Sequence, residues 1–106
     1  MKKNIFQKEA KKAFLIELNE LKAFYASKDF NVGDLCHEIL NCKGKVFLTG
    51  VGKSGHIANK ISATFSSTGT SSFFIHPAEA LHGDMGMIEK NDCIIVLSKS
   101  GESKEI

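Results

Sequence analysis

Residues 45–56 have the sequence Lys45-Val-Phe-Leu-Thr-Gly-Val-Gly-Lys-Ser-Gly-His56, in which a short apolar strand leads into a glycine-rich turn and then a helix. The turn, Gly50-Val-Gly-Lys-Ser-Gly55, matches G-x-G-x-x-G in the strand–turn–helix context that this pattern requires. Glycines let backbone N–H groups approach an anion, and a helix N-terminus adds partial positive charge. A P-loop would need glycine where Phe47 stands, so the turn predicts a dinucleotide site, a single-phosphate site, or a tight turn without a ligand.

The rest of the chain alternates helices with strands around this turn. The predicted elements are helices over 5–26, 32–41 and 56–68, strands over 45–49, 71–75 and 92–97, and a short helix with a loop over 78–90. This order indicates an α/β fold of three layers, with a parallel sheet between flanking helices. It is typical of the first half of a flavodoxin-like doubly wound domain, here preceded by two N-terminal helices, or of a chain that must pair with another. The unbroken apolar run in 92–97 predicts a strand buried on both faces.

Composition and charge exclude several classes of protein. The 106 residues suffice for one domain, and 14 lysines against 12 acidic residues leave a net charge of +2, too balanced for a nucleic-acid-binding protein. The apolar run Ile94–Leu97 is too short to span a membrane, and the first residues lack a signal-peptide core, so we expect a cytoplasmic protein. Cys36, Cys42 and Cys93 form no C-x-x-C pair, which argues against a disulfide framework or a structural zinc site.

Ligands of open α/β sheets bind beyond the carboxyl ends of the strands, so the loops after the three predicted strands are the candidate site. The loop Ser98–Ser103 has three hydroxyls and a glycine, which suit phosphate oxygens or simply cap the next helix. The loop His76–Asp84 holds two histidines, Glu79 and an aspartate, which could bind a metal or move protons, although their spacing matches no standard zinc motif. We assign His56 to the start of its helix and Cys93 to packing.

These loops carry a resemblance to a known family. The segments that carry it are Gly50–His56, Ala63–Thr70, Phe73–Ala80, His82–Met87 and Ser98–Ile106. Together they closely resemble the sugar isomerase (SIS) domain family, and within it the arabinose 5-phosphate isomerases. On this basis residues 1–43 are expected to be an N-terminal helical segment and residues 44–106 part of a SIS phosphosugar-binding domain. The resemblance also implies that the chain is an incomplete fragment of such an isomerase, whose family members continue with further catalytic residues.

The resemblance implies an aldose–ketose isomerase that interconverts D-ribulose 5-phosphate and D-arabinose 5-phosphate, supplying the Kdo of lipopolysaccharide or capsules. It implies catalytic roles for Lys53, Glu105 and His82. The positions that it implies for substrate binding are Ser54, Gly69, Thr70, His76, His82, Ser100, Gly101 and Ser103. It further implies an inhibitory zinc ion at His76, no redox cofactor or essential metal, a phosphorylated pentose as substrate, and a homotetramer.

Three other interpretations remain open from the sequence. A non-catalytic phosphosugar-binding or regulatory module would share this fold. A nicotinamide dehydrogenase would need an acidic residue at the end of the second strand, where His76 and Pro77 stand and Glu79 lies slightly too far along. An inert fragment that folds poorly is the third.

Overall fold

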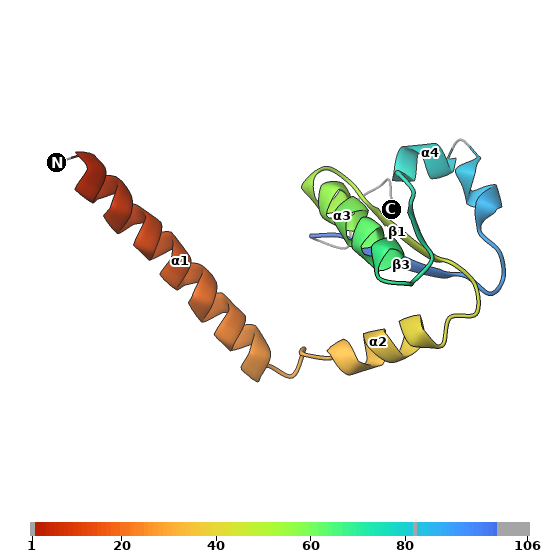
Figure 1. The fold of residues 1–106 in the computed structure, drawn as a ribbon, viewed down its shortest axis with the longest axis horizontal. Coiled ribbons are helices and arrows are strands. Elements are labelled where there is room, and N and C mark those ends of the chain that lie inside the picture. Colours follow the sequence, from red (N-terminus) through yellow and green to blue (C-terminus); the bar gives the residue numbers. More distant parts are fainter. Residues whose placement is uncertain (1, 82, 100–106) are drawn as a thin grey trace. The chain divides into compact units, whose positions relative to one another are not determined.

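The computed structural model describes residues 2–81 and 83–99 (Figure 1). Its elements are α1 Lys2–Ala26, α2 Val32–Leu40, β1 Val46–Gly50, α3 Lys53–Ser67, β2 Ser72–Phe74, α4 Pro77–Leu81, the 3-10 helix η1 Asp84–Met87, and β3 Cys93–Leu97. The strands of this described part form one parallel sheet in the spatial order β2-β1-β3. The predicted α/β class, a parallel sheet with flanking helices after two N-terminal helices, is therefore confirmed.

The chain divides into two compact units, Met1–Leu35 and Cys36–Ile106. In the first unit, α1 is a single long helix, and none of its residues is buried. Aromatic rings pack together at the end of α1. The Phe30 ring lies edge-on to the rings of Phe24 and Tyr25, with 5.3 Å and 6.0 Å between ring centres. In the part of the chain that the structure describes, no helix is long and apolar enough to cross a membrane.

The core of the second unit lies between the sheet and α3, which packs against all three strands (Figure 1). Val46 and Leu48 project from β1 onto Ala58 of α3, and all three are buried. Side chains alternate along a strand, so the intervening Phe47 lies on the other face, where its ring is 5.8 Å from that of Phe73. The strand β1 is therefore buried on both faces, and one of these faces meets the buried stripe of α3 in the core.

The strand β3 departs from the prediction that it is buried on both faces. Cys93, Ile95 and Leu97 pack against the core, but Ile94 and Val96 are 49% and 45% exposed in this unit. The prediction was wrong because β3 is an edge strand and its two faces have different neighbours. An apolar run does not reveal which of its residues face a covering helix.

Candidate functional site

A cavity of about 270 Å³ lies at the carboxyl edge of the sheet, where β1 and β2 end and α3 begins. It is lined by Gly50, Gly52, Gly55, His56, Asn59, Phe74 and His76. The volume is just below the range of roughly 300–1,000 Å³ that is typical of drug-sized ligands, so the cavity suits a small metabolite. The cavity lies at the edge of the sheet where the sequence analysis placed the candidate loops.

The glycine turn is shorter than the sequence indicated, because α3 begins at Lys53 and not at His56. Gly52 ends the turn with φ +62° and ψ −129°, a conformation that side-chain-bearing residues rarely adopt. Gly50 and Gly55 then approach closely, since a Cβ on Gly55 would stand 2.5 Å from the Gly50 carbonyl oxygen. The chain thus passes from strand to helix within two residues, and the first turn of α3 is brought to the edge of the cavity.

The start of α3 is suited to an anion. Gly52 is its N-cap and offers no side-chain hydrogen bond to the first N–H groups of the helix, which have no partner within the helix itself. Lys53, which the sequence placed in a loop, is instead the first residue of α3, and its side chain is exposed. Ser54 follows it and is half-buried.

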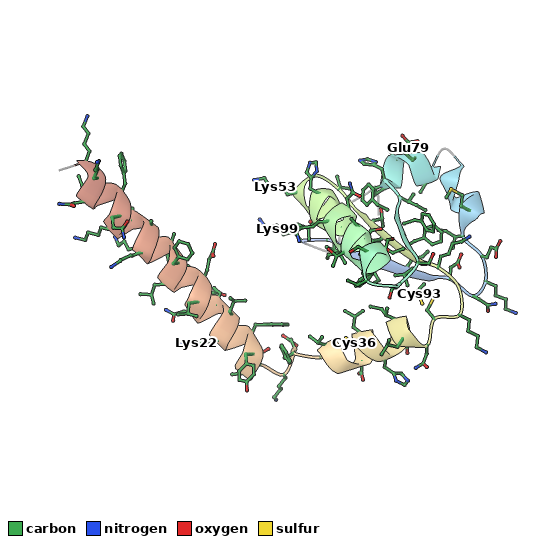
Figure 2. The ribbon with its side chains drawn as sticks, viewed as in Figure 1. Lys22, Cys36, Lys53, Glu79, Cys93 and Lys99 are labelled. Carbon is green, nitrogen blue, oxygen red and sulfur yellow. The ribbon has the colours of Figure 1, made fainter. Side chains whose placement is uncertain are left out.

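A second lysine lies at the same edge of the sheet. Gly50 at the end of β1 pairs with Leu97 at the end of β3, and Lys99 follows two residues later with an exposed side chain. Figure 2 shows Lys53 and Lys99 at this end of the strands. The edge therefore presents two cations next to a helix N-terminus, which favours a negatively charged ligand.

His76 lines the cavity just beyond β2, and its contact with substrate stays a prediction from the resemblance. Its Nδ1 accepts a hydrogen bond from the Ala78 backbone N–H at 3.1 Å. The neutral ring therefore carries its proton on Nε2, which can donate to a ligand oxygen. A zinc ion on Nε2 would require the proton on Nδ1 and hence the loss of the Ala78 hydrogen bond.

His56 and Asn59 are lining residues that the sequence interpretation missed, since it assigned His56 to the helix start alone. A detectable signal was present, because positions 52, 55, 56 and 59 have the i, i+3, i+4, i+7 spacing of one helix face. A polar histidine and asparagine on the face that continues the glycine turn indicate a second row of ligand contacts. The local loop motif alone gave no reason to extend the site along the helix.

Gly69 and Thr70 are not brought to this cavity. Gly69 has φ +104°, and the Thr70 N–H donates to the Phe65 carbonyl at 2.8 Å, the arrangement that ends a helix with a Schellman motif. Because α3 ends at the edge of the sheet where β2 begins, both residues lie opposite the cavity in this unit. Their place here is explained by helix termination, and substrate contact remains an expectation from the resemblance.

Five predicted site residues lie outside the described residues, namely His82, Ser100, Gly101, Ser103 and Glu105. Within residues 2–81 and 83–99, no group of three or more His, Cys, Asp or Glu side chains is placed to hold a metal ion. The described part of the cavity therefore offers backbone N–H groups, an amide, two imidazoles and nearby ammonium groups as ligand contacts.

The parallel sheet, with a helix N-terminus and a cavity at its carboxyl edge, defines an α/β domain suited to a small anionic ligand. The particular family is shown by comparison: the SIS domain model matches residues 39–106, and the chain belongs to the SIS domain family. It is 50% identical, over 103 residues, to the arabinose 5-phosphate isomerase KdsD of Salmonella typhi, covering 95% of this chain. It is 66% identical over 68 residues to the arabinose 5-phosphate isomerase KpsF of Escherichia coli O6:H1, covering 64% of this chain.

A solved structure is also similar over nearly the whole chain. The E. coli CFT073 protein c3406, solved in complex with arabinose 5-phosphate, matches with a TM-score of 0.83 and 45% identity, covering 96% of this chain and 55% of that one. The chain spans 31% of the KdsD sequence and 21% of the KpsF sequence. The similarity confirms the family recognised from the loop motifs.

Proposed function

We propose that the chain is part of an aldose–ketose isomerase that interconverts D-ribulose 5-phosphate and D-arabinose 5-phosphate. The observation that carries this proposal is the cavity beside the start of α3, with Lys53 and Lys99 at the same edge. Its size and charge suit a phosphorylated pentose. The similarity to KdsD and KpsF, both arabinose 5-phosphate isomerases, supports the choice of sugar.

The phosphate is proposed to be the handle by which the substrate is held. The sequence of these 106 residues has no arginine, and its contacts to the phosphate oxygens are proposed to be N–H groups at the start of α3, lysines, and the hydroxyls of Ser54, Ser100 and Ser103. Binding energy gained at the phosphate orients the reacting carbons at the other end of the sugar. His56, Asn59 and His76 line the cavity at positions suited to sugar hydroxyls.

The reaction moves a proton between two adjacent carbons of the sugar. In the aldose these are the aldehyde carbon and the hydroxyl-bearing carbon next to it. Glu105 is proposed as the base that removes the proton from one carbon and returns it to the other by way of an enediolate. Lys53 is proposed to stabilise the negative oxygen that develops, and His82 to donate to a sugar oxygen or relay a proton. These steps require no redox cofactor or metal.

Calorimetric titration of the chain with D-arabinose 5-phosphate tests the binding site. Lys99→Ala, at the same edge as the start of α3, is expected to weaken binding by roughly ten- to a hundredfold, as loss of a charged hydrogen bond does. Lys90→Ala is the matched control, since Lys90 precedes β3 at the opposite edge and is expected to leave binding unchanged. Equal effects of the two substitutions, or equal affinity for unphosphorylated D-arabinose, would remove the proposed phosphate site.

Turnover distinguishes an isomerase from a non-catalytic phosphosugar-binding module. In a protein of the full length of the relatives, exchange of the substrate C–H proton with deuterated solvent is expected, and Glu105→Gln should abolish it while binding persists. Undiminished exchange in the Glu105→Gln variant would overturn the assignment of the base. Binding without exchange in the unmodified protein would favour the regulatory module.

The setting of this activity also belongs to the proposal. The product is proposed to serve Kdo synthesis for lipopolysaccharide or capsule in the cytoplasm. Residues 44–106 are proposed to act as part of a SIS domain, after a helical segment over residues 1–43. The assembly is a homotetramer, which agrees with the apolar side chains that α1 exposes in its own unit. Zinc at His76 would inhibit by replacing the Nε2 proton donor.

A further inference from the structure

Two cysteines from distant parts of the sequence meet at the edge of the sheet opposite the cavity. Cys42 follows α2, and Cys93 is the first residue of β3. Both are bound to the same carbonyl: the Cys42 thiol lies 3.6 Å from the Lys45 oxygen, and the Cys93 backbone N–H donates to that oxygen at 2.9 Å. The Cys42 thiol is also 3.5 Å from the Asn91 carbonyl oxygen, two residues before Cys93.

The Cys93 thiol lies close to the same segment, 3.9 Å from the carbonyl oxygen of Glu38, which is four residues before Cys42. A hydrogen bond to Cys42, followed by burial, raises the pKa of the Cys93 thiol to about 11. Both side chains are half-buried and pack against the apolar core formed by Val46, Leu48 and Ala58. Cys93 is therefore a thiol at neutral pH, so Cys42 is the sulfur to which we assign the first oxidation step.

The remaining cysteine provides an internal comparison. Cys36 is exposed on α2, whereas Cys42 and Cys93 are half-buried. Figure 2 shows Cys36 on this helix and Cys93 near the edge of the sheet where α2 ends. If accessibility decides the product of oxidation, Cys36 should cross-link two chains. If proximity decides it, Cys42 and Cys93 should form a disulfide within one chain.

We propose that Cys42 and Cys93 are a reversible dithiol–disulfide pair, a redox modification site that joins the end of α2 to the start of β3. Hydrogen peroxide is the oxidant. The Cys42 sulfur attacks a peroxide oxygen, the O–O bond breaks, and Cys42 becomes a sulfenic acid with release of one water. The Cys93 sulfur then forms the S–S bond and its proton leaves with the sulfenic hydroxyl as a second water. Two electrons pass from the thiols to the peroxide, and a dithiol reductant reverses the change.

The disulfide is expected to stabilise the second unit without altering the cavity. It would close a long loop that includes β1, α3 and β2, and so restrict the unfolded chain. The cavity is at the carboxyl edge of the sheet, whereas Cys93 begins β3 at the amino edge. The pair thus stands independently of the proposed isomerase function, and either can fail without the other.

Peptide mapping after mild oxidation tests the pair. The chain is treated with one equivalent of hydrogen peroxide, remaining thiols are alkylated, and disulfide-linked peptides are identified by mass spectrometry. A Cys42–Cys93 linkage is expected in the unmodified chain and in the control Cys36→Ser, and dithiothreitol should restore both free thiols. Cys42→Ser and Cys93→Ser should abolish the intramolecular linkage.

The same samples provide outcomes that contradict the proposal. Chains cross-linked through Cys36, or a Cys36→Ser variant that keeps all its thiols free after oxidation, would overturn it, and neither result depends on whether the Cys42 or Cys93 variants fold. The oxidised Cys36→Ser chain is expected to melt several degrees higher than its reduced form, and an unchanged or lower melting temperature would overturn the predicted stabilisation.

Discussion

Gly52 and Gly55 are both required by the strand-to-helix turn, but for different physical reasons. At Gly52 a Cβ would have open space around it, so only the backbone conformation, with φ +62° and ψ −129°, excludes other residues. At Gly55 the conformation is ordinary, but a Cβ would collide with the Gly50 carbonyl oxygen. The position of Lys53 depends on both glycines, because together they let the chain pass from the end of β1 at Gly50 to the start of α3 at Lys53 within two residues.

Replacing Gly52 with alanine is expected to destabilise the second unit by about 1–3 kcal/mol, the usual cost of holding a side-chain-bearing residue in such a conformation. Gly33→Ala is the control, because Gly33 lies in α2, has no positive φ, and leaves its added Cβ in open space. It should be neutral or stabilise by about 0.5–1 kcal/mol. Urea denaturation measures both, and a Gly52→Ala chain as stable as the unmodified one would contradict the assignment.

The segments that lead into β1 and β3 are tied together by one carboxylate. Asp92 accepts the Lys45 backbone N–H on one oxygen and the Glu89 backbone N–H on the other, each at 2.7 Å. A side chain at Gly44 would occupy the space of the Asp92 carboxylate, so a glycine precedes this contact. The two parallel strands therefore begin in register because a side chain, and not only the sheet ladder, aligns them.

Asp92 is expected to make stability depend on pH in the acid range. The Glu89 N–H first, and then the Lys45 N–H, hold its pKa below the ordinary value of 3.8 in the folded chain, against a smaller opposing effect of burial. A lowered folded pKa means that this stabilisation is present above pH 3.8 and is lost as pH falls through the folded value.

Asp92→Asn should lower the melting temperature by a few degrees at neutral pH and reduce its further fall below pH 4, as roughly expected for loss of a charged hydrogen bond. Asp29→Asn is the control, since Asp29 lies in the turn after α1 and belongs to the other unit. Melting temperatures are measured between about pH 2 and pH 7, which covers the range over which carboxylates titrate. The same pH dependence in the two variants would contradict the role of Asp92.

Both units expose large apolar side chains. Phe14 is 73% exposed and Leu21 is 66% exposed in the first unit, and Ile94 and Val96 are exposed on the sheet of the second. Helices in proteins take most of their stability from the packing of an apolar face against other elements. This surface is consistent with the proposed assembly of several copies.

Phe14→Glu is expected to shift the chain toward smaller species in analytical ultracentrifugation, because it places a charge on an apolar surface of α1. Asn19→Glu adds the same charge to α1 at a position that is already polar, and should leave the sedimentation profile unchanged. Sedimentation as a monomer by the unmodified chain, or equal profiles for all three, would argue against self-association through α1.

The local patterns were sufficient for the order of elements and for the glycine turn. Apolar residues recur at helical spacing along α3, and Gly50, Gly52 and Gly55 are all needed within six positions, so these features are specified by residues close in sequence. The family was recognisable for the same reason, because its motifs lie in short loops. Element ends were less certain, as the start of α3 at Lys53 shows.

Three features depended on the tertiary structure: which strand lies at the edge, which face of α3 extends the cavity to Asn59, and which cysteines meet at one carbonyl. Strands that alternate with helices are compatible with several spatial orders, so alternation alone could not place β3 beside β1 or leave Val96 exposed. Cys42 and Cys93 are almost half the chain apart, and no short-range pattern links them. Contacts of this kind arise only when the core between β1 and α3 brings distant segments together.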